Sequence, residues 1–92
     1  MIEYELEAKQ DPRKSFYGKA TVEYDIKTGV FALSSYGTLV ANYNRKENSM
    51  EVLGTHSATT LRHIKEFIFQ MTEETGLTKA KIEDRFMKEE TL

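Results

Sequence analysis

The chain has 92 residues and no cysteine, and its 15 acidic and 13 basic residues give a net charge of −2 at neutral pH. This length predicts a single domain, residues 1–92, and the lack of cysteine excludes disulfides, thiolate metal sites and cysteine nucleophiles. No apolar stretch approaches the length of a membrane span, and acids alternate through MIEYELEAKQ where a signal peptide would be basic and then apolar. We therefore expect a cytoplasmic protein with no membrane partner.

Apolar and polar residues alternate through the first half of the chain, which is the period-two pattern of half-buried strands. The segment Ile2–Ala8 places Ile2, Tyr4, Leu6 and Ala8 on one side and three glutamates on the other. The alternation resumes in the segment Gly18–Ile26, which places Ala20, Val22, Tyr24 and Ile26 on one side. Short polar turns separate the segments and predict an antiparallel meander. The remaining expected strands are Val30–Ser35, Leu39–Asn44 and Ser49–Leu53.

The period changes to that of a helix after Gly54. Ser57 is a suitable N-cap, and the segment Ala58–Thr75 contains no helix breaker before Gly76. A shorter helix is expected to begin at Thr78 and to turn Ile82 and Phe86 inward. The fold class predicted is α+β, with an antiparallel sheet of four to five strands packed by one long helix and a short final helix. The apolar stripe that covers the sheet consists of Leu61, Ile64, Phe67, Ile68 and Met71.

Signatures of catalysis are missing from the sequence. It contains no nucleophile elbow, no glycine-rich phosphate loop and no H-E-x-x-H pair, so we expect no enzymatic activity and no cofactor. His63 and Glu66 lie three residues apart on the long helix and could share one metal ion, but a third ligand is required. His56 is about two helical turns away, roughly 10 Å along the axis, which is too far to share that ion. We expect His63 on the polar helix face, His56 in a loop, and no metal.

A surface for a protein partner is predicted on the long helix. Phe69 falls beside Arg62 and Lys65, outside the apolar stripe. It is covered by the short final helix, covered by a second copy of the chain, or free as an anchor for another protein. Aromatic side chains beside arginine are frequent in protein interfaces. The predicted partner-binding residues are Tyr36, Arg62, His63, Lys65 and Phe69.

Nucleic-acid binding is the alternative function. Five tyrosines fall in or beside predicted strands, where aromatic rings can stack single-stranded bases. Against this, the first strand is acidic and no basic run exceeds two residues, so half-buried tyrosines that stabilise the sheet are the competing interpretation. A homodimer through the edge strands Ile2–Ala8 or Ser49–Leu53 is also possible. The residues predicted to contact nucleic acid are Tyr17, Tyr36, Arg13, Lys14, Lys19, Arg45 and Lys46.

Three segments resemble a family of small uncharacterised proteins of phages, plasmids and Gram-positive bacteria. They are KSFYGKA at 14–20, SYGTLVA at 35–41 and HSATTLRHIKEF at 56–67, and they occur in the order expected for the family. At His56 the family more often has tyrosine. The resemblance implies a domain of unknown function and an intracellular accessory protein of a mobile element. Such proteins often bind a host protein, so the resemblance implies an inhibitor of host defence of the anti-CRISPR kind.

Overall fold

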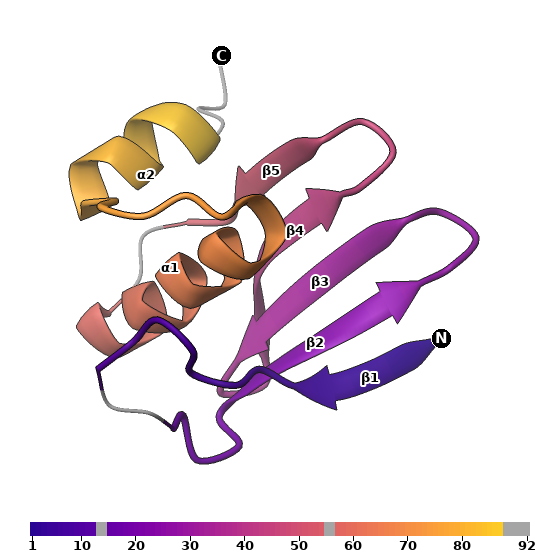
Figure 1. The fold of residues 1–92 in the computed structure, drawn as a ribbon, viewed down its shortest axis with the longest axis horizontal. Coiled ribbons are helices and arrows are strands. Elements are labelled where there is room, and N and C mark those ends of the chain that lie inside the picture. The colour runs from indigo at the N-terminus through magenta and orange to yellow at the C-terminus, as the bar shows by residue number, and fades with distance from the viewer. Residues whose placement is uncertain (13–14, 55–56, 88–92) are drawn as a thin grey trace.

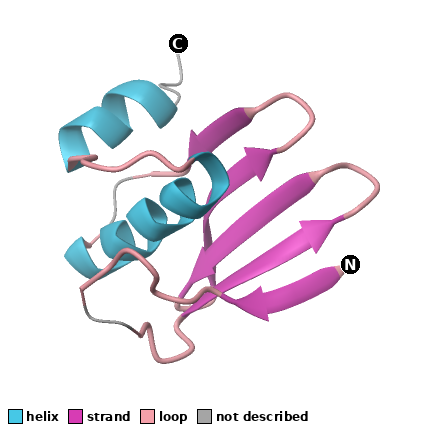
Figure 2. Cartoon of the chain, in the orientation of Figure 1, coloured by secondary structure: helices cyan, strands magenta, loops and turns pink. Residues whose placement is uncertain are grey.

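The computed structural model describes residues 1–12, 15–54 and 57–87 of the chain. It contains a five-stranded antiparallel sheet in the order β1-β2-β3-β4-β5 and two helices on one face of that sheet (Figures 1 and 2). The predicted α+β architecture is therefore confirmed. The elements are β1 (Ile2–Glu5), β2 (Ala20–Asp25), β3 (Val30–Ser35), β4 (Thr38–Asn44), β5 (Ser49–Val52), α1 (Ala58–Thr72) and α2 (Lys79–Phe86).

The strand register divides the sheet into a buried face and an open face. One row of directly paired residues contains Val22, Leu33, Ala41 and Val52, all of which are buried. Because side chains alternate along a strand, these residues lie on the face that α1 covers. The stripe on α1 meets them with Ile64, Phe67 and Ile68, which are fully buried as predicted.

The first strand is shorter and more exposed than its alternation predicts. β1 ends at Glu5 instead of Ala8. Ile2 and Tyr4 pair with Tyr24 and Val22 and so share their face of the sheet, as predicted, but the expected burial is wrong, since Ile2 is 49% exposed and Tyr4 is also exposed. Leu6, just past the strand, is buried. Ile26, predicted to face inward, lies in the β2–β3 turn and is 64% exposed. The pattern identified strand residues correctly, but α1 does not extend over this end of the sheet (Figure 1).

Both helices begin at the predicted caps, and α1 ends earlier than predicted. Glu73 adopts a left-handed conformation, with φ of 63°, and its amide donates to the Phe69 carbonyl. The helix therefore ends at Thr72, three residues earlier than the predicted Thr75. Thr78 caps α2, which packs against β5 and buries Ile82. No helix in the described part of the chain is long and apolar enough to cross a membrane.

The N-cap of α1 provides a test of the helix assignment. The Ser57 hydroxyl accepts a hydrogen bond from the Thr60 amide, and the first turn of α1 has no acidic residue. We expect Ser57→Ala to lower the free energy of unfolding by about 1 kcal/mol, because it leaves that amide without its cap. Ser57→Asp, the matched control, should retain wild-type stability, since aspartate caps equally well. Urea unfolding measures both, and equal stability of the Ala variant and the wild type would contradict the cap.

Candidate functional site

Two tyrosine–glycine turns lie next to each other at one end of the sheet. Tyr17 and Tyr36 both have φ of 52°, and the glycine after each also has positive φ, which is the signature of a type I′ turn. The Tyr36 amide donates to the Lys19 carbonyl at 2.8 Å and so ties the two turns together. A bulky residue with positive φ is an outlier that costs about 1 kcal/mol and persists only where the surrounding structure enforces it.

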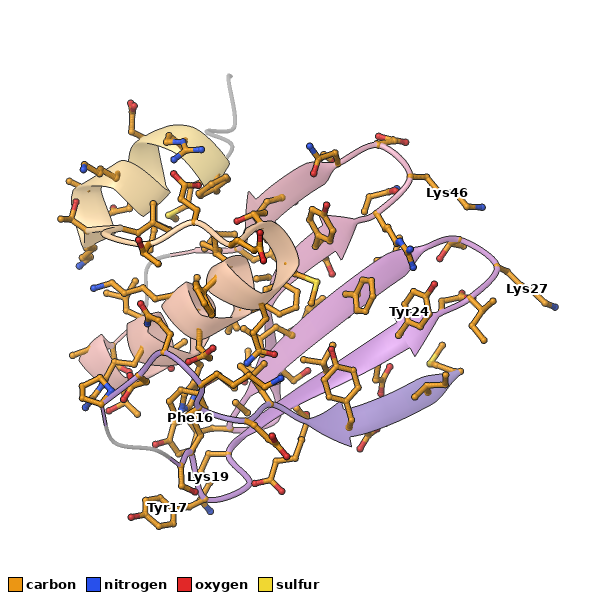
Figure 3. The ribbon with its side chains drawn as sticks, in the orientation of Figure 1. Phe16, Tyr17, Lys19, Tyr24, Lys27 and Lys46 are labelled. Carbon is orange, nitrogen blue, oxygen red and sulfur yellow. The ribbon has the colours of Figure 1, made fainter. Side chains whose placement is uncertain are left out.

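The rings of these two tyrosines remain in solvent. Tyr17 is 79% exposed and Tyr36 is 58% exposed. Figure 3 shows Tyr17 pointing away from the body of the protein, beside Phe16 and Lys19 on the loop that leads into β2. The turns flank a pocket of about 170 Å³, which we call the tyrosine pocket. It is lined by Ser15, Phe16, Tyr17, Lys19, Tyr36, Thr59, Arg62 and His63.

His63 lies against this pocket as a buried side chain, only 1% exposed, so its predicted place on a polar face is wrong. Its ring makes an edge contact with Phe16 at 4.6 Å between centroids and a tilted contact with Tyr36 at 5.8 Å. Its Nδ1 is 2.8 Å from the hydroxyl of Ser35, which in turn is 3.1 Å from the hydroxyl of Thr60. These contacts join the end of β3 to the first turns of α1 and fix the ring against which Tyr36 rests.

The Ser35–His63 contact has the spacing of a nucleophile and its base, but a substrate could not reach the Ser35 hydroxyl. Ser35 is buried and does not line the pocket. Its hydroxyl is also engaged by Thr60. Because a nucleophile has to reach its substrate, we interpret this contact as a structural hydrogen bond between β3 and α1. The described residues contain no group of three or more His, Asp or Glu side chains placed to hold a metal ion, and His56 lies outside them.

Burial of His63 makes the stability of the fold depend on pH. Burial lowers its pKa, the nearby Asp11 opposes that shift, and Arg62 adds to it. A histidine whose pKa is lower in the folded than in the unfolded state takes up its proton preferentially in the unfolded chain. We therefore expect the free energy of unfolding to be constant above the unfolded pKa, near 6.5, and to fall as pH drops below it.

Unfolding in urea between pH 7.5 and pH 5, compared with His63→Asn, measures this effect. Asparagine does not titrate and can still place a polar group near Ser35, so its stability should decline less over the same range. An identical decline in the two proteins would contradict the assignment to His63.

A loop from the N-terminal segment holds Arg62 in place. Asp11 is buried and receives Nε and Nη2 of Arg62 on its two carboxylate oxygens, each at 3.1 Å. Glu66, fully buried one turn further along α1, accepts the amides of Gln10 and Asp11 at 2.7 and 3.0 Å. Gln70 donates to the second oxygen of Glu66 at 2.9 Å. Glu66 and His63, considered together as metal ligands, therefore belong to two separate hydrogen-bond networks.

The predicted partner-binding residues are distributed over three pockets. Tyr36, Arg62 and His63 meet at the tyrosine pocket. Lys65 lines a second cavity, of about 300 Å³, between the N-terminal loop and the segment that follows α1, and Arg62 lines this cavity as well. Phe69 is half-buried in a shallow pocket with Lys9 and Gln70, and none of the residues that line this pocket comes from α2.

The predicted nucleic-acid residues are divided as well. Tyr17, Lys19 and Tyr36 gather at the tyrosine pocket, whereas Arg45 and Lys46 lie in the β4–β5 turn at the opposite end of the sheet (Figures 1 and 3). Arg13 and Lys14 lie outside the described residues. The two predicted sets of binding residues did not include Ser15, Phe16 and Thr59, which also line the pocket. The only local signal was the repeated Tyr-Gly pair, at 17–18 and 36–37.

Comparison with curated proteins gives no match, and comparison with solved structures gives none either. Among protein families, the family of unknown function DUF8033 matches residues 4–84. The match covers all five strands except the first residues of β1, both helices up to Asp84, and every residue of the tyrosine pocket. The chain belongs to the DUF8033 family of unknown function.

Proposed function

We propose that this protein is a non-enzymatic binding module that recognises a protein partner through the tyrosine pocket. The observation that carries the proposal is the pair of exposed rings, Tyr17 and Tyr36, held at positive φ on either side of a pocket. A strained backbone position persists only where the rest of the fold compensates for its cost. In native proteins such positions cluster at binding and catalytic sites.

The chemistry of the pocket suits a protein surface. Tyrosine and arginine are the residues most enriched among those that dominate the affinity of interfaces, and rigid tyrosines lose little entropy on binding. Arg62 is already oriented by its two bonds to Asp11, and the side chain of Lys19 is exposed. An apolar or aromatic side chain in the pocket, with an acidic group near Lys19, would complement this arrangement.

A narrower form of the proposal follows from the resemblance to phage and plasmid proteins. In that form the partner is a host defence protein, and the module inhibits it by occupying a functional surface, as an anti-CRISPR protein does. The partner-binding set then becomes Tyr17, Lys19, Tyr36 and Arg62, and His63 acts by positioning Tyr36. Lys65 lines the cavity on the other side of Arg62, and Phe69 lies in a separate pocket.

Nucleic-acid binding remains the second candidate because of a row of rings on the sheet. Tyr24 stacks on Phe31 with 4.2 Å between centroids, and both rings are half-buried, whereas Tyr43, 6.4 Å from Phe31, is buried. Figure 3 shows Tyr24 on the part of the sheet next to the hairpin turns, from which Lys27 and Lys46 extend. Aromatic rings beside lysines can stack bases and contact phosphates of a single strand.

Affinity capture from a lysate of the source cells, with and without nuclease, separates the two candidates. The wild-type protein is compared with the double variant Tyr17→Asn/Tyr36→Asn. The proposal expects a stoichiometric protein that survives nuclease and is lost from the double variant. Capture that disappears with nuclease, and falls steeply with salt, would instead support nucleic-acid binding.

A further inference from the structure

The outer edge of β1 carries main-chain groups that point away from the sheet. β1 is the first strand in the sheet order and pairs only with β2 among the described elements. The Leu6 amide donates to the carbonyl of Ala20, the residue opposite it, at 2.9 Å. In an antiparallel ladder such bonded pairs alternate, so Ile2 and Tyr4 also bond to β2. Glu3 and Glu5 therefore direct their amides and carbonyls outward.

A shallow groove accompanies this edge on the helix side of the sheet. It has a volume of about 310 Å³ and is lined by Tyr4, Glu5, Glu7, Lys9 and Gln70. At its far end Gln70 donates to the Glu7 carbonyl at 2.7 Å, so α1 closes the edge just beyond β1. A strand added to an open edge gains main-chain hydrogen bonds and places alternate side chains in adjacent pockets. The groove at Tyr4 has the position of such a side-chain pocket.

The charge of the open sheet face indicates which kind of peptide segment would bind at the β1 edge. The five strands contain no lysine, arginine or histidine. Their acidic residues all fall on the face opposite the helices, because they share the register parity of the pair Glu3 and Glu23. They are Glu3, Glu5, Glu23, Asp25 and Glu51.

A second copy of the chain does not suit this edge. Pairing of β1 with β1 would bring Glu3 and Glu5 against the same two glutamates of the other copy, and like charges directly opposite destabilise a strand pair. A strand with lysine or arginine at alternate positions would meet these carboxylates with opposite charge instead. Its intervening side chains would face the groove and the exposed ring of Tyr4.

We propose that the open edge of β1 binds an extended segment of another protein, with basic side chains at alternate positions beside Glu3 and Glu5 and an apolar side chain in the groove at Tyr4. This interaction is separate from recognition by the tyrosine pocket and does not depend on it. The two surfaces adjoin, since the Glu5 carboxylate lies 3.7 Å from where a Cβ at Gly18 would be. One partner could therefore contact both.

The test uses a short blocked peptide in which lysine alternates with valine, titrated into the 92-residue protein and followed by NMR. We expect the amide shifts to change at residues 1–6 and the Glu3 and Glu5 amides to become protected from hydrogen exchange. The matched peptide with glutamate in place of lysine should bind at least about ten-fold more weakly. In the variant Glu3→Lys/Glu5→Lys this preference should reverse.

A backbone variant separates strand addition from general charge attraction. Glu3→Pro removes an outward amide and leaves the β1–β2 bonds intact, which is where an edge strand tolerates proline. Glu3→Pro should lower the affinity for the lysine peptide about ten-fold. Glu51→Lys changes a residue on the same face of the sheet but in β5, the opposite edge strand, and should retain most of the affinity. Thermal unfolding verifies that both variants fold.

Four results would overturn the proposal. They are equal binding of the two peptides, unchanged binding of the lysine peptide by Glu3→Pro, peptide-induced shifts centred away from β1, and dimerisation through β1, which sedimentation experiments would detect. The double variant Tyr17→Asn/Tyr36→Asn should bind the lysine peptide like the wild type, so loss of the proposed partner and loss of edge binding are distinguishable.

Discussion

Glu66→Leu should lower the free energy of unfolding by about 3–4 kcal/mol, one of the largest effects of any single substitution in the described chain. The Glu66 carboxylate is fully buried and accepts hydrogen bonds from the amides of Gln10 and Asp11 and from the Gln70 side chain. Leucine has a similar size but accepts none of them. The Asp11 amide, in a buried residue, would lose its partner, and an unsatisfied buried donor costs about 1–3 kcal/mol.

Glu66→Gln is the matched control for this result. Its amide oxygen can still accept from the loop amides, so we expect a loss about half as large as that of the leucine variant. Urea unfolding followed by circular dichroism gives both values. Equal losses in the two variants would mean that the negative charge, and not acceptance of the two amides, determines the stability of this loop.

Tyr17→Asn/Tyr36→Asn should abolish partner binding without destabilising the fold. Removal of an aromatic hot spot typically costs 2 kcal/mol or more, so each ring is expected to account for about 30-fold or more in affinity. Asparagine adopts positive φ more readily than tyrosine, so the free energy of unfolding should stay the same or rise by up to about 1 kcal/mol. A mainly structural role of the two rings predicts the reverse, with lower stability and unchanged binding.

Ile26→Asn is the matched control for the tyrosine variants. Ile26 is an exposed apolar residue in the β2–β3 turn, at the opposite end of the sheet from the tyrosine pocket. Its replacement removes a comparable apolar surface and should leave affinity for the partner unchanged. Weakened binding by this variant as well would indicate that the partner responds to exposed apolar surface in general.

The order of the elements was predictable because it depends on local periodicity. Alternation identified five strand segments, the change of period identified α1, and Ser57 and Thr78 identified both helix starts. Alternation identified which face of each strand would be apolar, but not how much of that face the helices would cover. Ile2 alternates as regularly as Val22, but β1 lies at the edge of the sheet, beyond α1, and its apolar residues stay exposed.

The candidate site was only partly predictable because its contacts join distant parts of the chain. The buried His63 is hydrogen-bonded to Ser35, 28 residues away in the sequence, and the buried Glu66 accepts the amide of Asp11, 55 residues away. The helical wheel placed His63 on the polar face and gave no indication that Glu66 is buried. Tyr36 was predicted to bind a partner, but its positive φ and its position beside Tyr17 follow from the tertiary pairing of the two turns.

The most direct test of the central claim is the affinity of the captured partner for three purified proteins, measured by isothermal titration calorimetry. The proteins are the wild type, Tyr17→Asn/Tyr36→Asn and Ile26→Asn. The account predicts that the wild type and Ile26→Asn bind equally and that the tyrosine variant loses binding while it stays as stable as the wild type. Full affinity in the tyrosine variant would contradict a binding function for the tyrosine pocket.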